Sequence, residues 1–206
     1  MWGKHVLLKY GWGVKAIELF EAIRGRRSVG VVKDEMPPRE AIEKMLEAAT
    51  WAPNHHHTEP WKFFVLTGQA RHRLGEAMAE ALAAKLDDPN TPEARAQLER
   101  MRKNPLRAPV IIAVAVSPSD DPRVIELEEI EAVACAVQNM LLAAHALGLG
   151  AIWRTGAICY DPRLKPFFGL SEREQLLGFV YVGYPAGPQP VGKRTPFAQK
   201  TVWMNR

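Results

Sequence analysis

Cysteine is scarce in this chain of 206 residues, and its pattern excludes two classes of protein. Cys135 and Cys159 lack the spacing of a zinc site or of a redox-active pair, so neither a disulfide scaffold nor a cysteine-based metal site is expected. Both lie among apolar residues, where buried free thiols are common. We therefore expect two buried thiols and a reducing, cytoplasmic compartment.

Runs of a single charge are also lacking. The 27 basic and 23 acidic side chains give a net charge of +4, spread along the sequence without a block of lysine and arginine. A nucleic-acid-binding module needs clustered positive charge to follow a phosphate backbone, so no nucleic-acid partner is expected. The small positive surplus suits a small anionic ligand instead.

The sequence shows no convincing secretory signal and no convincing membrane span. Residues 1–13 have no apolar core and no small-residue cleavage site, and we expect them to be an N-terminal extension, disordered or added by an upstream start. The stretch 132–153 carries no formal charge and approaches the length of a membrane span. Gln138, Asn139 and His145 within it favour a helix buried in a dimer core.

Hydrophobic periodicity predicts one α+β domain over residues 14–206. Apolar residues at helical spacing predict helices, and continuous apolar runs predict strands. The helices are expected at 14–24, 37–51, 69–86, 92–103 and 128–147, with a short one near 162–168. The strands are expected at 62–67, 110–116, 152–153 and 176–182, with 110–116 central because it is apolar throughout. Helices outnumber strands and no parallel crossover is evident, which favours α+β over α/β.

Two segments of this domain have special features. The helix over 128–147 carries an apolar face and small residues elsewhere, so it should be the longest buried helix. The tail after Pro185 is rich in proline and glycine and has no periodicity. We expect this tail to wrap over a neighbouring surface.

Arg26, Arg27 and Ser28 are the first candidates for ligand binding, because they follow a predicted helix in a loop. Two guanidinium groups and a hydroxyl offer several donors that suit a phosphate. Paired arginines at a helix end also complement the helix dipole, and taken alone that structural role is the commoner one.

The three consecutive histidines, His55 to His57, are candidate metal ligands, but their spacing does not favour a metal site. Neighbouring loop side chains point in different directions, and no cysteine, aspartate or second histidine cluster lies nearby at ligand spacing. The loop is either solvated surface or a donor to the edge of a cofactor.

The sequence GAIWRTG at 150–156 leaves an apolar strand and enters a glycine-bearing turn, where backbone N–H groups become free to meet a ligand. Taken alone, Trp153 is more often a core residue, and Lys193 and Arg194 are ordinary exposed charges.

The order of these motifs resembles the nitroreductase superfamily over about residues 14–197. The motifs are AIRGRRSVG, APNHHHTEPWKFFVLTG, a long alanine-rich helix ending in GLGAIWRTGA, and FVYVGYPAG with a late KRTPF. The short NAD(P)H nitroreductase branch is the most similar. The resemblance implies a mixed sheet flanked by helices and a homodimer with FMN in clefts shared by both subunits. NAD(P)H would be the co-substrate.

The resemblance also implies roles for the candidate residues. Arg26, Arg27 and Ser28 would hold the phosphate and ribityl chain of FMN or its pyrimidine edge, and Arg194 would be a further phosphate ligand. The partner subunit would contribute a second group to the flavin, namely Trp51, Pro53, Asn54 and His55.

A third group at the strand end would line the other side of the flavin: Trp153, Arg154 and Thr155. The backbone N–H of that turn would approach flavin N5, the atom that accepts hydride. No catalytic side chain and no metal are implied, because the flavin carries the chemistry.

Three positions depart from the family pattern. Gly30 stands where many relatives have a basic residue near flavin N1 and O2, and Glu59 stands where the usual residue is glutamine. Trp51 replaces an arginine that is frequent in the most similar branch. The first two departures bear on the redox potential of the flavin.

The implied activity is a ping-pong transfer of hydride from NAD(P)H to a nitroaromatic, a quinone or a similar small acceptor. Dehalogenation or flavin fragmentation is the alternative enzyme class, and residues 85–107 are the candidate for the lid that such enzymes carry. A non-catalytic flavin-binding protein is the alternative outside enzymes.

Overall fold

The computed structural model describes residues 17–205. The expected extension over residues 1–13 and the expected helix start near Val14 lie outside these residues. The first helix, α1 (Leu19–Gly25), begins later than its apolar spacing suggested. The reason is Glu18, whose side chain accepts hydrogen bonds from the backbone N–H groups of Phe20 and Glu21 and so caps the helix there.

A four-stranded sheet forms the middle of the molecule, and its strands pair in the order β1-β2-β4-β3. All three strand pairs are antiparallel, and a single parallel bridge joins Ser28 to Ala151 beside the sheet. The strands are β1 (Trp61–Leu66), β2 (Val110–Val116), β3 (Gly150–Arg154) and β4 (Gln175–Gly183). Strand β2 is buried along its whole length, which confirms its predicted central position.

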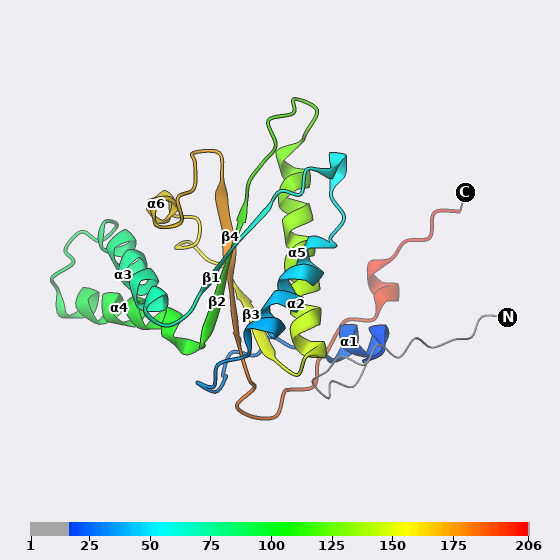
Figure 1. Cartoon of the computed structure of the whole chain (residues 1–206), viewed down its shortest axis with the longest axis horizontal. Helices are drawn as coiled ribbons and strands as arrows, with labels where there is room; N and C mark the ends of the chain where they lie inside the picture. The colour runs from blue at the N-terminus through cyan, green and yellow to red at the C-terminus, as the bar shows by residue number, and fades with distance from the viewer. Residues whose placement is uncertain (1–16, 206) are drawn as a thin grey trace.

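Helices cover both faces of this sheet, so the molecule has three layers (Figure 1). One face carries α2 (Arg39–Thr50) and α5 (Glu126–Ala146). The other carries α3 (Gln69–Ala83), α4 (Pro92–Lys103) and the short α6 (Lys165–Phe168). Short 3-10 turns lie at His55–His57 (η1), Asn104–Arg107 (η2), Pro162–Leu164 (η3) and Phe197–Lys200 (η4).

The pleat of β2 divides the core into two parts. Ile112 and Val114 pack toward α5, whereas Ile111 and Ala113 pack toward α3. The α+β fold class is confirmed, because antiparallel strands are covered by helices that do not serve as parallel crossovers.

Helix α5 is the longest helix among residues 17–205 and packs on the sheet as predicted. Val133, Val137 and Met140 on its apolar face are fully buried. The prediction of two buried thiols is wrong for Cys135, which is exposed on the opposite side of α5, whereas Cys159 is buried. The helical period explains the difference, because Cys135 lies two residues from both Val133 and Val137 and therefore faces away from them. Within the described residues, no helix is long and apolar enough to cross a membrane.

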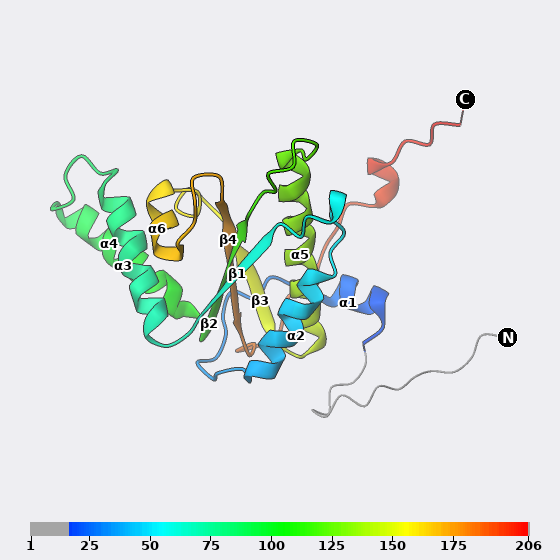
Figure 2. The same cartoon turned by 45° about the horizontal axis from the view of Figure 1, so that its top comes forward.

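The tail after Pro185 leaves the sheet, passes beside α1 and extends away from the three layers (Figure 2). Its large apolar side chains are exposed, including Phe197, Trp203 and Met204. The outer side chains of α1 are exposed as well, with Leu19 and Phe20 each 61% accessible. Exposed apolar side chains on α1 and on the tail are consistent with a tail that packs on a neighbouring surface. That packing stays a prediction.

Candidate functional site

The consecutive Arg26 and Arg27 form a cationic cluster with Arg194 of the tail at the end of α1. The pKa of Arg26 is lowered by burial and by the nearby charges of Arg194 and Arg27. Among residues 17–205, none of these three arginines forms an ion pair with a carboxylate. Nε of Arg26 is buried and has no hydrogen-bond partner there. Neighbouring guanidinium groups without a carboxylate partner are a donor set that suits a phosphate.

The tail is held against this cluster by Arg27. Its Nε donates to the carbonyl of Pro190 at 3.1 Å, and its Nη1 donates to the carbonyls of Arg24 and Arg26, each at 2.6 Å. Gly192 lies directly against the guanidinium group, and a Cβ at that position would overlap with it. The glycine therefore permits the close approach that brings Arg194 beside Arg26.

The segment that follows the cluster runs along the edge of β3. Ser28 bridges to Ala151, and the N–H of Val29 donates to the carbonyl of Ala151 at 3.0 Å. The side chain of Ser28 is exposed and lines a groove of about 320 Å³ between residues 28–31 and 186–190. The structure thus brings the predicted Arg26, Arg27, Ser28 and Arg194 together beside the first residues of β3.

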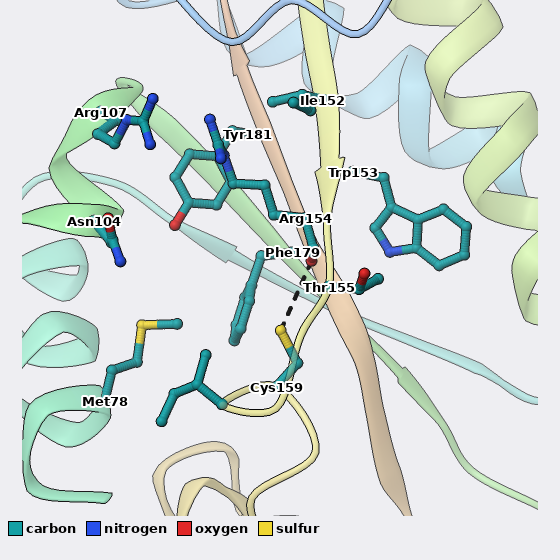
Figure 3. A pocket seen from close by; sticks show the side chains of 11 residues that line it. Met78, Asn104, Arg107, Ile152, Trp153, Arg154, Thr155, Cys159, Phe179 and Tyr181 are labelled. Carbon is teal, nitrogen blue, oxygen red and sulfur yellow. Dashed lines mark hydrogen bonds between the residues drawn. The ribbon is translucent and has the colours of Figure 1, made fainter. Parts of the chain in front are cut away.

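The C-terminal end of β3 and the turn after it carry the second group of predicted residues. Trp153 and Arg154 are partly buried, whereas Thr155 is exposed. Trp153 and Arg154 point to opposite faces of the strand, as neighbouring strand residues do (Figure 3). Nε1 of Trp153 and Nε of Arg154 are both buried without a hydrogen-bond partner among the described residues. A cavity of about 300 Å³ opens on the Arg154 side.

The histidine loop adopts a strained conformation. His56, His57 and Glu59 have positive φ values of 57°, 54° and 48°, although none of them is glycine. The rings of His55 and His56 stack with their centroids 3.8 Å apart, and Nδ1 of His55 lies 2.7 Å from Oε2 of Glu128. Such backbone conformations persist only where surrounding contacts fix them.

A buried carboxylate supplies the main anchor for that loop. Glu129 is 1% exposed; it accepts a hydrogen bond from the hydroxyl of Thr58 at 2.5 Å and another from the N–H of Ser119 at 3.1 Å. A second local bond runs from the N–H of Glu59 to Oδ1 of Asn54 at 3.0 Å. Glu59 itself is exposed. In the part of the chain that the structure describes, no group of three metal-ligating side chains is present.

The histidine loop and the cationic cluster lie at opposite ends of α5. His55 contacts Glu128 in the first turn of the helix, whereas Gly25 packs against the ring of His145 in its last turn. Residues 128 and 145 are separated by about 25 Å at 1.5 Å per residue. One chain therefore does not bring the predicted His55 to its own cluster, and the predicted Trp51, Pro53 and Asn54 lie between the end of α2 and this histidine. Trp51 is 80% exposed and Pro53 is also exposed.

Sequence reasoning missed several residues of this region. Arg107 and Tyr181 line the cavity beside Arg154, and Glu129 anchors the histidine loop. The available signals were weak: a lone arginine before a buried strand, a tyrosine in an apolar strand, and a glutamate among others at the start of a helix.

Comparison with known proteins identifies the family. A model of the nitroreductase family matches residues 23–184. The Escherichia coli protein named "Putative NAD(P)H nitroreductase YdjA" is 34% identical over 170 residues, which cover 82% of this chain and 89% of that protein. Iodotyrosine deiodinase 1 from Sus scrofa is 31% identical over 181 residues, covering 82% of this chain and 62% of that protein.

Solved structures agree with this result. A nitroreductase-like family protein from Bacillus cereus has a TM-score of 0.80 and 29% identity, with 93% of this chain and 98% of that chain covered. A nitroreductase from Desulfovibrio desulfuricans in complex with FMN has a TM-score of 0.65 and 30% identity, with 91% and 96% covered. The chain belongs to the nitroreductase family.

The contacts of Glu129 lead to a test of how the loop is held. Glu129→Ala should lower the free energy of unfolding by about 2 to 4 kcal/mol, because the Thr58 hydroxyl and the Ser119 N–H lose a charged acceptor in a buried place. Glu131→Ala removes an exposed carboxylate from the same helix and should change the free energy by less than about 0.5 kcal/mol. Urea denaturation at equal protein concentration measures both. Similar effects of the two substitutions would contradict the anchoring role.

Proposed function

We propose that this protein is an FMN-dependent oxidoreductase that passes hydride from NAD(P)H to a small electrophilic acceptor. The observation that carries the proposal is the cluster of Arg26, Arg27 and Arg194, which holds three positive charges without a carboxylate partner among residues 17–205, beside the first residues of β3. The FMN complex of the Desulfovibrio relative supports the choice of ligand.

The residues beside the first part of β3 and those at its last turn would fit different parts of FMN. Arg26, Arg27 and Arg194 would bind the phosphate, and the orphaned Nε of Arg26 would gain an acceptor. Ser28, which is exposed in the adjoining groove, would bind the ribityl chain or the pyrimidine edge. The turn at Thr155 would present backbone N–H groups to the ring. FMN supplies the hydride-transfer chemistry when bound, and the protein orients it and excludes competing reactions.

Trp153 and Arg154 would have different parts in such a site, because their side chains lie on opposite faces of β3. Trp153 lies on the α5 side, with an indole N–H that has no partner among residues 17–205. Arg154 extends toward the backbone of Gly30, where a Cβ would lie 3.6 Å from its Nη2. Arg154 therefore brings positive charge to the position where many relatives have a basic side chain.

The second half of the site would come from another copy of the chain. His55 lies about 25 Å along α5 from the cluster of the same chain, and Trp51, Pro53 and Asn54 lie between the end of α2 and His55, so we propose that this segment reaches the flavin of the partner subunit. The exposure of Trp51 supports this arrangement, since a large aromatic side chain that is 80% accessible is available to contact a ligand or a subunit.

We propose no side-chain acid for protonation of the acceptor. Burial raises the pKa of Tyr181 to about 12 and that of the Cys159 thiol to about 11, so both groups hold their protons at neutral pH. Water is the proton source that remains. Nitroaromatics, quinones and activated alkenes are acceptors that such an open site would admit.

Reductive dehalogenation is the second candidate, favoured by the similarity to iodotyrosine deiodinase. Residues 85–107, the candidate lid, are largely α4 and η2, and α4 buries Ala94 and Leu98. Arg102 of α4 also pairs with Glu76 of α3 at 2.9 Å. These contacts hold the segment on α3. Turnover of iodotyrosine against a nitroaromatic, each with the same reductant, separates the two candidates.

Anaerobic mixing of FMN-loaded protein with NADH or NADPH tests the activity. We expect at least one nicotinamide to bleach the flavin absorbance, with one two-electron equivalent consumed per bound FMN. Dithionite serves as the control for reducible flavin. Bleaching by dithionite but by neither nicotinamide would contradict the oxidoreductase and favour a flavin-binding protein without this activity.

Loss of one guanidinium tests the phosphate assignment. Arg26→Ala should weaken FMN binding by about tenfold to a hundredfold, since a charge-assisted contact contributes about 1.5 to 3 kcal/mol. Arg24→Ala is the matched control, because Arg24 is an exposed arginine in the last turn of the same helix. Flavin retained after dialysis measures both variants. Equal retention would refute the assignment.

A further inference from the structure

A cavity of about 300 Å³ lies on the face of the sheet opposite α5, between α3, η2, β3 and β4. Figure 3 shows its polar end, where the guanidinium groups of Arg107 and Arg154 lie near the ring of Tyr181. The other end is formed by Met78 and Phe179. The cavity thus has a cationic end and an apolar end.

The cationic end is electrically unbalanced. Among residues 17–205, neither Arg107 nor Arg154 forms an ion pair, and no aspartate or glutamate lines the cavity. Arg154 lies over the ring of Tyr181 at 5.1 Å, and its Nε is buried without a hydrogen-bond partner. Burial and the charge of Arg107 lower the pKa of Arg154. Arg107 is exposed to solvent, whereas Arg154 is partly buried, so the free-energy cost of the unpaired charge falls mainly on Arg154, and a bound anion would offset it.

Among residues 17–205, the lining of the cavity offers no anion at neutral pH. The two other ionisable groups are Tyr181 and Cys159, and burial keeps both protonated. The Cys159 thiol instead lies 3.8 Å from the carbonyl oxygen of Arg154, to which it donates. An anion that neutralises Arg154 in this cavity would therefore come from a bound molecule.

We propose that this cavity binds a small aromatic carboxylate. Its carboxylate oxygens would accept hydrogen bonds from Arg107 and Arg154, in the planar geometry that guanidinium groups favour. Its ring would lie against Met78 and Phe179, where sulfur and aromatic contacts are favourable. This site is distinct from the cluster of Arg26, Arg27 and Arg194, and binding there does not require FMN. The cavity shares Trp153, Arg154 and Thr155 with the proposed flavin site.

Fluorine NMR with 4-fluorobenzoate tests this proposal on the FMN-saturated protein. We expect saturable binding of one molecule per chain, at least about tenfold tighter than binding of the neutral analogue 4-fluorobenzamide. Equal affinity for the acid and the amide would overturn the proposal, because the positive charges would then not be used. Binding of the acid to flavin-free protein that is lost on saturation with FMN would also overturn it, because the cavity would then belong to the flavin site.

Substitution of Arg107 locates the binding, since this residue has no part in the proposed flavin site. Arg107→Gln should weaken 4-fluorobenzoate binding by about tenfold or more, and Arg107→Lys should retain part of the affinity. Arg102→Gln is the matched control, because Arg102 pairs with Glu76 outside the cavity, and it should leave the affinity unchanged. Undiminished binding by folded Arg107→Gln protein, verified by thermal unfolding, would overturn the assignment. Binding of the acid by a protein that fails to retain FMN would leave this site standing while refuting the proposed function.

Discussion

The length of α5 is the constraint on which the arrangement of the site depends. The helix spans Glu126–Ala146, and its buried face fixes it against the middle of the sheet. Its first turn holds the histidine loop through Glu128 and Glu129, and its last turn packs against Gly25 at the end of α1. A helix with a well-packed face does not bend to close a gap of about 25 Å. The two groups of candidate residues therefore stay apart within one chain.

The sheet imposes a second separation, between the two sides of β3. Trp153 lies toward α5, whereas Arg154 lies with Tyr181 and Arg107 on the side of α3. A strand must direct neighbouring side chains to opposite faces, so one short motif serves two different environments. The α5 side adjoins the surface where a flavin is proposed, and the α3 side contains the cavity with two unpaired guanidinium groups.

Much of the fold could be predicted from the sequence, because local patterns determine it. The continuous apolar run predicts the buried strand β2, and the helical spacing of apolar residues predicts α4 and α5. Neither pattern depends on residues far away in the sequence. The start of α1 was missed because the Glu18 cap was not considered, and the exposure of Cys135 was missed because apolar neighbours in sequence do not define a helix face.

The candidate site was only partly predictable. Arg26, Arg27 and Ser28 are consecutive, so their sequence alone suggested a phosphate site, and Arg194 was linked to them only by the family resemblance. Its position beside Arg26 depends on Gly192, which lets the tail approach Arg27. Arg107 and Arg154 are more than forty residues apart in the sequence, and tertiary packing brings them near each other. No local sequence pattern predicts that proximity.

Subunit mixing tests the shared site most directly. Arg26→Ala and Trp51→Ala chains with different tags are coexpressed, and the doubly tagged heterodimer is isolated and titrated with FMN. If each flavin is bound by the cluster of one chain and the Trp51 loop of the other, the heterodimer has one intact site and one site with both defects. We predict one FMN per heterodimer bound with wild-type affinity, although both homodimers bind weakly. Two equally weakened sites in the heterodimer, and none with wild-type affinity, would contradict the shared site.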